Sequence, residues 1–326
     1  MIPIAEVAKG ILRVGPLDTK SRTPITSPFL VVGERVAILE PGEAGQIPEL
    51  LEAFKQLDID RDRIDYAIAS HIHLHHLGGV NVLLKELPKT KIVIHKFGVP
   101  YLMEPTRLNE GVRQVWGAGC PEISPVPQDR IWGVSGGEVI DLGGRELEII
   151  ETLGHSPHHI SIFDRLTRSL FPGDAVGCFF GGPSTERPHP DIVAPLFDFE
   201  KAVDSLHRLR ALKPSALFLF GYNGASFSPD QSMQWSENDI TAVERICREG
   251  MKQKMSNKEI SRRVQEYYES VGVPETGARE EYYRSPAVSA PTAEDRERSR
   301  SVQGGQGQFP MYAYLLKKDP SLEMPK

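Results

Sequence analysis

Hydrophobic and polar positions follow two periods along the first two thirds of the chain, and these periods predict strands and helices in turn. Apolar positions that recur every three to four residues over 47–57 and 199–212 predict two amphipathic helices. Short apolar runs bounded by turn residues predict buried strands. We expect these strands at 11–14, 28–32, 35–40, 64–69, 91–94, 138–142, 147–152, 159–163, 169–171 and 216–220. Strands that bracket helices twice predict an α/β domain built in layers.

The remaining segments predict less regular structure. A further helix is expected over 76–87, and Pro88 marks its end. The stretch 100–137 is rich in proline and glycine, which favours loops and short helices. Two more helices are expected at 236–254 and 256–271, each opening on a serine that serves as N-cap.

The C-terminal part differs in composition from the rest. Residues 276–308 are polar, charged and glycine-rich, which predicts a flexible arm. The apolar stretch Phe309–Leu316 predicts a segment that docks on its own domain or on a partner subunit, which makes a homodimer possible. The predicted division is a main domain over 1–228, a helical extension over 229–275, and an arm with docking segment over 276–326.

Composition narrows the classes of partner. The chain has 326 residues, 40% of them apolar, which is enough for a full hydrophobic core. A net charge of −6 without a basic stripe argues against nucleic acid, and no apolar run is long enough to span a bilayer. The N-terminus lacks a signal-peptide pattern, and three widely spaced cysteines form no disulfide framework. We therefore expect a cytoplasmic protein that acts on a small-molecule substrate.

The most distinctive chemistry is a run of four histidines within six residues, His71, His73, His75 and His76, directly after the strand at 64–69. Imidazole is the commonest protein ligand for zinc and non-haem iron. His155 and Asp174 follow two further predicted strands. Strand ends at one edge of a sheet converge on one cleft, so these side chains predict a shared metal site.

The motifs that carry this chemistry resemble those of the metallo-β-lactamase-fold hydrolases. The resemblance covers residues 10–228 and rests on motifs in the family's order: Leu39-Glu40-Pro41-Gly42, His71-x-His73-x-His75-His76, Gly154-His155-Ser156-Pro157 and Gly173-Asp174. It implies an αββα sandwich that binds one or two metal ions at a sheet edge. It also implies that His71, His73 and His155 bind the first metal, that Asp174 bridges to a second metal bound by His76, and that Glu40 supports a ligand.

Two departures from the family pattern affect the second metal. His75 stands where the family has an aspartate, and residues 221–224 contain Tyr222 but not the family's final-loop histidine. Three interpretations stay open. The second site persists with His75, His76, Asp174 and Tyr222; or only the first site fills, and His75 or His76 acts as general base or hydrogen-bond donor; or the protein is a non-catalytic relative.

The implied activity is metal-dependent hydrolysis. One or two transition-metal ions, zinc or iron, would supply a metal-bound hydroxide that attacks an ester, thioester, lactone or phosphodiester. Asp174 or His75 would orient the attacking water. The alternative is a non-haem di-iron protein that binds or reduces dioxygen or nitric oxide, and a non-enzymatic scaffold is a third class.

Candidate substrate contacts lie in the segment after Asp174. Phe179 and Phe180 are the expected apolar walls of the pocket, Arg187 is expected to bind a substrate carboxylate, and His189 is expected in a loop over the cleft.

Overall fold

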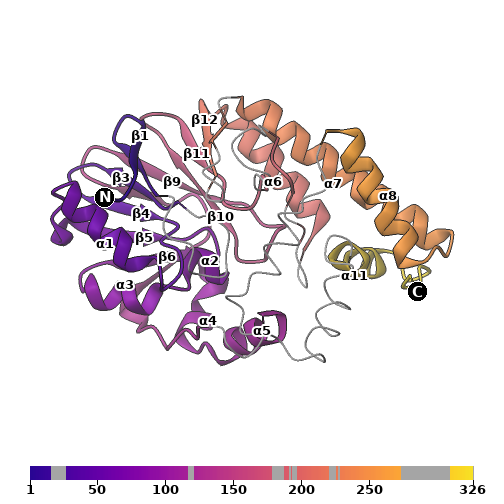
Figure 1. Cartoon of the computed structure of the whole chain (residues 1–326), viewed down its shortest axis with the longest axis horizontal. Helices are drawn as coiled ribbons and strands as arrows, with labels where there is room; N and C mark the ends of the chain where they lie inside the picture. Colours follow the sequence, from indigo (N-terminus) through magenta and orange to yellow (C-terminus); the bar gives the residue numbers. More distant parts are fainter. Residues whose placement is uncertain are drawn as a thin grey trace.

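The computed structural model describes residues 1–15, 27–116, 121–177, 187–190, 192, 197–219, 225–226, 228–272 and 309–325. Two sheets pack face to face, and helices cover the outer face of each (Figure 1). This is the αββα sandwich that the resemblance implied. The site residues lie along one edge of the two sheets, where several strands end.

The first sheet contains the first seven strands in the order in which they occur along the chain. Strands β1 to β4 pair antiparallel, and β4 to β7 pair parallel. Strand β4 is buried at all four positions, as expected for a parallel strand covered on both faces. The strands are β1 (Ile4–Ala8), β2 (Ile11–Val14), β3 (Phe29–Val32), β4 (Val36–Leu39), β5 (Ile64–Ile68), β6 (Lys91–His95) and β7 (Ile131–Val134).

The second sheet has six strands in the order β13-β12-β11-β10-β9-β8. All neighbours pair antiparallel except β11 and β12, which are parallel. The strands are β8 (Val139–Asp141), β9 (Glu146–Glu151), β10 (Ile160–Asp164), β11 (Ser169–Phe171), β12 (Ala216–Phe218) and β13 (Ala225–Ser226). Phe29 of the first sheet packs against Phe171 and Phe218 of the second, with ring centroids 5.2 and 5.8 Å away.

Helices α1 (Ile47–Gln56), α2 (Leu74–Leu77) and α3 (Val80–Glu86) follow the strands of the first sheet, and residues from all three join one apolar cluster on its outer face. The predicted helix over 76–87 is in fact two helices, α2 and α3. Between them Gly79 passes close to Ile47, where a Cβ atom would lie 2.7 Å from the Ile47 side chain, so glycine is needed at this position. The backbone N–H of Gly79 also donates to the carbonyl of Gly42.

The stretch 100–137 is more regular than predicted. It contains α4 (Val99–Met103, beginning just before it), α5 (Thr106–Trp116) and β7, which extends the first sheet beside β6. Strand β1 was also missed. Three short 3₁₀ helices complete this half: η1 (Arg61–Arg63), η2 (Lys96–Gly98) and η3 (Gln128–Arg130).

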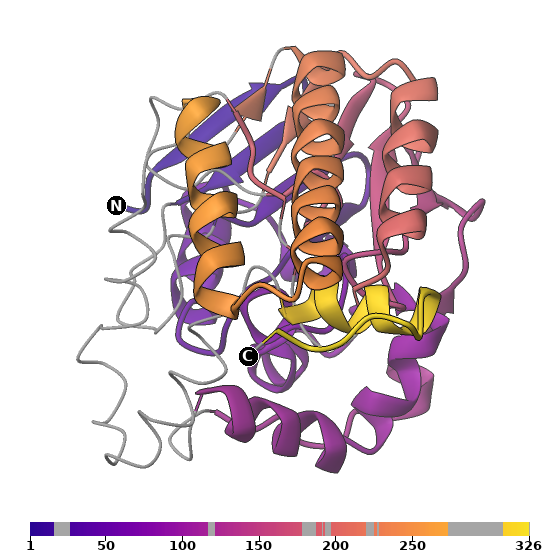
Figure 2. The same ribbon diagram turned by 90° about the vertical axis from the view of Figure 1, so that its right-hand side faces the viewer.

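The outer face of the second sheet is covered by α6 (Phe199–Ala211), α7 (Pro229–Lys252) and α8 (Asn257–Ser270), which lie side by side in Figure 2. Helix α11 (Phe309–Lys318) runs across their ends and packs on α7 through Met311 and Leu315. The docking segment therefore contacts its own chain. The predicted homodimer therefore loses this segment as support and stays a prediction. The three domain boundaries also stay predictions.

The two serine N-caps have different outcomes. The side chain of Ser256 accepts from the backbone N–H of Glu259, so the expected cap of α8 is present. The expected cap at Ser236 is wrong, because α7 already begins at Pro229, a residue preorganised for the first helical turn. The predicted arm over 276–308 lies outside the described residues.

Candidate metal centre

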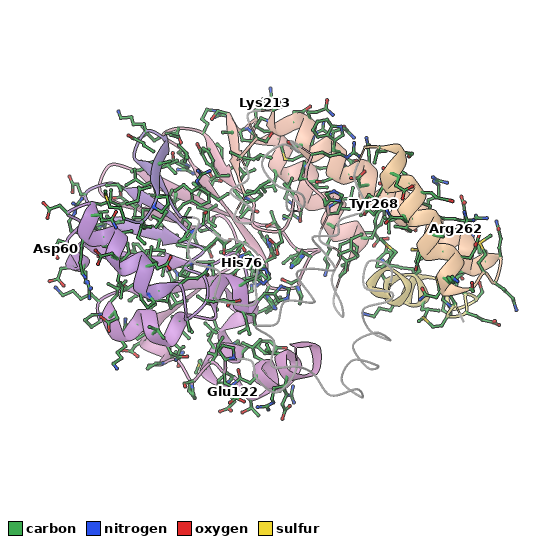
Figure 3. The ribbon with its side chains drawn as sticks, in the orientation of Figure 1. Asp60, His76, Glu122, Lys213, Arg262 and Tyr268 are labelled. Carbon is green, nitrogen blue, oxygen red and sulfur yellow. The ribbon has the colours of Figure 1, made fainter. Side chains whose placement is uncertain are left out.

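The histidine run begins just past the end of β5. The chain leaves the sheet at Ile68, and His73 precedes the first residue of the short helix α2, on which His75 and His76 lie. His71 and His76 are fully buried, whereas the side chain of His75 is 26% exposed. In Figure 3, His76 lies near the centre of the view, where the purple elements of the first sheet meet the pink elements of the second.

His155 and Asp174 come from turns that follow β9 and β11 in the second sheet. Each follows a glycine with positive φ, Gly154 at 133° and Gly173 at 54°. A Cβ atom on Gly173 would lie 2.4 Å from that of Ser70, so this turn fits against the histidine run only with glycine. Both turns thereby bring their ligand side chains to the edge where β5 ends.

Four of these side chains meet at one point. His155 Nε2 lies 3.3 Å from both His71 Nε2 and His73 Nδ1, and Asp174 Oδ2 lies 3.5 Å from His155 Nε2 and 3.6 Å from His71 Nε2. Four tetrahedral ligands around zinc, each bonded at 2.0–2.1 Å, stand about 3.3 Å apart. These separations fit that arrangement; the pair His71 Nε2 and His73 Nδ1, at 2.6 Å, is closer.

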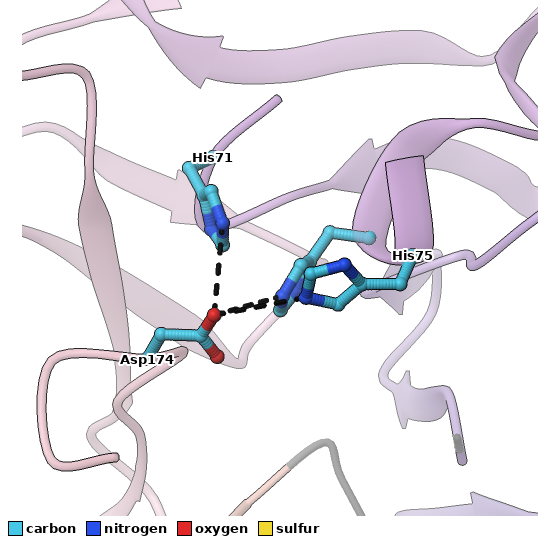
Figure 4. Close-up of side chains that lie close together, drawn as sticks. His71, His75 and Asp174 are labelled. Carbon is cyan, nitrogen blue, oxygen red and sulfur yellow. Dashed lines mark hydrogen bonds and ion pairs between the residues drawn. The ribbon is translucent and has the colours of Figure 1, made fainter. Parts of the chain in front are cut away.

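A second group shares His71 and Asp174 with the first. Asp174 Oδ2 lies 3.3 Å from His76 Nε2 and 3.7 Å from His75 Nε2 (Figure 4). The donor atoms of His71, His75, His76 and Asp174 all lie within 4.8 Å of one another. Asp174 therefore stands between two sets of imidazoles, in the place of a ligand that bridges two ions.

Glu40 and Ser70 contact the Nδ1 atoms of His76 and His71 and thereby orient these two rings. The carboxylate of Glu40 accepts from the backbone N–H of Ser70 and lies 2.7 Å from His76 Nδ1. Ser70 Oγ lies 3.0 Å from His71 Nδ1. With Nδ1 of each ring facing these oxygens, Nε2 of each ring faces Asp174 and the cation position beside it. Such partners fix the tautomer and the direction of metal-binding imidazoles.

His159 supports Asp174 and not the cation position itself. Its Nε2 accepts from the backbone N–H of Asp174, and its Nδ1 lies 2.8 Å from Thr152 Oγ1. Burial, followed by the neighbouring imidazole of His155, holds the pKa of His159 well below its usual range. A neutral His159 is therefore a fixed part of the turn that carries Asp174.

Burial and charge set opposite protonation states within the cluster. Burial and the adjacent imidazoles hold the pKa of His71 and of His73 well below the usual value, so both are neutral, as metal binding requires. For His76, burial alone would lower the pKa, but the carboxylates of Glu40 and Asp174 outweigh it and raise the pKa to about 10. Asp174 is also buried, yet His76 and His75 hold its pKa well below the usual range.

The predicted substrate contacts have mixed outcomes. Tyr222, Phe179 and Phe180 lie outside the described residues. Arg187 forms an ion pair with Asp239 of α7, and its guanidinium lies 5.5 Å from the ring centroid of Trp235. The ring of His189 lies 5.4 Å from that of Tyr268 on α8. Their roles in substrate binding stay predictions.

Sequence reasoning assigned no role to Ser70, Thr152 or Asp239. A hydroxyl residue inside a motif carries no spacing signal of its own, and the partner of Asp239 lies 52 positions away in the chain. The side chain of His158, another residue that sequence reasoning did not place in the site, is buried beside the cluster, and its ring stacks on that of His71 at 6.4 Å. Burial lowers the pKa of His158 to about 4.

Within the described part of the chain, every helix is too short or too polar to cross a membrane.

Comparison with known proteins agrees with this architecture. The model of the metallo-beta-lactamase superfamily matches residues 22–222. The metallo-beta-lactamase fold-containing protein ST1585 of Sulfurisphaera tokodaii is 28% identical over 250 residues, which cover 72% of this chain and 81% of the relative. Its crystal structure superposes with a TM-score of 0.56 at 25% identity, over 72% of this chain and 86% of that one.

Two other relatives match shorter parts. Hydroxyacylglutathione hydrolase GloC of Haemophilus influenzae is 29% identical over 48% of this chain and 68% of its own length. A relative described as diflavin flavoprotein A 1, from Thermosynechococcus vestitus, is 28% identical. The match covers 60% of this chain but only 33% of the relative's length. Since the family model spans most of the sandwich, including every residue of the donor cluster, the chain belongs to the metallo-beta-lactamase superfamily.

Proposed function

We propose that the protein is a metal-dependent hydrolase of an ester, thioester, lactone or phosphodiester. One observation carries the proposal: His71, His73, His155 and Asp174 converge from three separate turns with the spacing of a tetrahedral cation site. A bound cation would polarise the substrate and lower the pKa of a water molecule to about 7. The relative named hydroxyacylglutathione hydrolase supports this reaction class.

The chain's own residues divide the remaining work. His71, His73, His155 and Asp174 would hold the first ion, and Asp174 would also orient the nucleophile. His75 and His76 extend the cluster to a second ion that shares Asp174, which favours the interpretation in which the second site persists. If that site stays empty, His75, whose side chain is 26% exposed, would take the proton of the attacking water.

The donor set determines which ions are suitable. Five imidazoles and one carboxylate are soft compared with an all-oxygen site, so zinc and iron are favoured over magnesium and calcium. A cytoplasmic location is part of the proposal, and the buried, unpaired thiol of Cys247 is consistent with a reducing compartment.

The alternative is a di-iron protein that binds or reduces dioxygen or nitric oxide. It is favoured by the two overlapping donor groups that share His71 and Asp174, and by the relative described as a diflavin flavoprotein. Protein purified without added metal separates the two. Colourless protein with zinc supports the hydrolase, and two irons with a visible charge-transfer band support the alternative.

The hydrolase is tested with a panel of lactones, thioesters and phosphodiesters. We expect His71→Ala and His155→Ala to lose both metal and activity. His207→Ala should keep both metal and activity, because it removes only an exposed imidazole on α6 that pairs with Glu237 of α7. Wild-type metal content in the first two variants would refute the ligand assignment, and a metal-loaded wild type that hydrolyses no member of the panel would refute the function.

A further inference from the structure

The segment after β6 passes directly beside the metal cluster. Gly98, at the end of η2, approaches Ile72, the residue between His71 and His73, so closely that a Cβ atom would lie 3.0 Å from Ile72 Cγ2. The same Cβ atom would lie 3.9 Å from that of His158. Backbone packing at Gly98 therefore holds this segment beside the histidine run.

A row of aromatic rings leads from this cluster to the surface. The ring of His158 stacks on His71, with an interplanar angle of 16°, and lies 6.3 Å from the ring of Tyr101 on α4. His158 is nearly buried, whereas Tyr101 is 37% exposed. The row therefore joins a donor residue of the cluster to a ring at the surface.

The outer end of this row is unusually apolar. Phe97 is 56% exposed, and Met103 is exposed within the same seven-residue stretch. The other exposed large apolar residues of the described chain are scattered singly: Met1, Val82, Val139, Leu166 and Met324. Single exposed apolar residues are ordinary, whereas a group of them on one surface marks a binding site.

We propose that Phe97, Tyr101 and His158 form the surface that receives an apolar or aromatic acyl portion of the substrate. The inference rests on the proposed hydrolase function and narrows its substrate class. Ligand sites combine mostly apolar walls with a few placed polar groups, and here the metal cluster supplies the polar part. These residues are not the expected walls Phe179 and Phe180, which lie outside the described residues.

The test uses the metal-loaded full chain and a series of acyl thioesters from acetyl to octanoyl, with phenylacetyl as the aromatic member. For the wild type we expect kcat/KM to rise about twofold or more per added methylene. In the double variant Phe97→Ala/Tyr101→Ala, the octanoyl-to-acetyl ratio should fall about tenfold. Tyr101→Phe should retain the wild-type ratio, since it keeps the ring.

Leu166→Ala serves as the matched control, because it removes an equally exposed apolar side chain from the turn between β10 and β11. The same chain-length dependence in the wild type and the double variant would overturn the inference. So would a ratio that falls as far in Leu166→Ala as in the double variant.

A binding measurement separates this inference from the proposed function. Calorimetry compares acetate, octanoate and phenylacetate as ligands of the metal-loaded protein. A preference for the larger carboxylates that disappears in the double variant supports the surface even if no thioester is hydrolysed. A preference that the double variant keeps, or a wild type without any preference, overturns it.

Discussion

At the scale of single residues, the donor atoms are aimed by buried contacts outside the cluster. Glu40 has a φ of 54°, a conformation that costs a non-glycine residue of order 1 kcal/mol. In this conformation its carboxylate reaches both the Ser70 N–H and His76 Nδ1. The strained conformation of Glu40 is therefore associated with the orientation of His76, and not only with the formation of a turn.

Glu40→Gln tests this role. The amide keeps the size of the side chain but removes the charge that faces His76, so metal affinity should fall about tenfold to a hundredfold. Competition with a chromophoric chelator measures it. Glu52→Gln, on an exposed residue paired with Lys55, is the control. Unchanged affinity in Glu40→Gln would mean that the carboxylate does not orient the ligand.

The site residues that belong to a sequence motif were the ones that could be predicted. His71, His73, His155 and Asp174 were predicted as one cluster from their positions after strands, and the structure brings them together. The contacts of Ser70 with His71 and of Thr152 with His159 could not be predicted, since the sequence does not show which ring nitrogen faces a nearby hydroxyl.

At the scale of elements, α7 holds the segment that follows Asp174. Ser236 Oγ donates to the carbonyl of Val176, and Asp239, one turn later, pairs with Arg187. Tyr267 of α8 donates to the same carboxylate at 2.7 Å. The helices of the C-terminal region thereby fix both ends of the stretch between Asp174 and Arg187.

The pair Arg187–Asp239 is imperfect, because Arg187 Nε and Asp239 Oδ2 are buried without a hydrogen-bond partner. Asp239→Leu leaves the guanidinium without its counter-charge and should lower the free energy of unfolding by about 3 kcal/mol. The double variant Arg187→Leu/Asp239→Leu should recover much of that loss, as measured by urea unfolding. A double variant less stable than Asp239→Leu would contradict this, because Arg187 would then stabilise the fold through contacts other than Asp239.

Elements with a continuous apolar period were predicted well, such as α1 and α6. Strand β7 was missed because Gly133 interrupts a four-residue run, and its pairing with β6 depends on distant sequence. The start of α7 was missed because its first turns are polar, and proline at its first position was not used as a start signal.

At the scale of the whole molecule, the sandwich brings the ligand-bearing turns of the two sheets to one edge, so the metal cluster is also a buried group of titratable residues. The fold itself followed from the order of the motifs. The contacts between the sheets and the outer helices could not be predicted in this way. Apolar residues can pack in many registers, and the local sequence pattern does not choose among them.

Stability without metal should therefore fall in acid. The pKa of His158 is about 4 in the fold against 6.5 when unfolded, and the pKa values of His71, His73 and His159 are lowered too. The unfolded chain binds more protons in this range, so stability present above pH 6.5 is lost as the pH falls toward 4.

For His158 alone the shift corresponds to about 3 kcal/mol. Urea unfolding of metal-free protein between pH 7.5 and 4.5 measures the loss, and His158→Gln should show a shallower dependence than the wild type. Identical slopes for the two proteins would contradict the burial of a neutral imidazole at this position.

The most direct test of the metal centre is a crystal structure with anomalous scattering at the zinc and iron edges. We expect a peak about 2.0–2.3 Å from His71 Nε2, His73 Nδ1, His155 Nε2 and Asp174 Oδ2. A second peak between Asp174, His75 and His76 would show that the variant second site also fills. Metal bound elsewhere on the chain, with no peak between the three histidines and Asp174, would contradict the account.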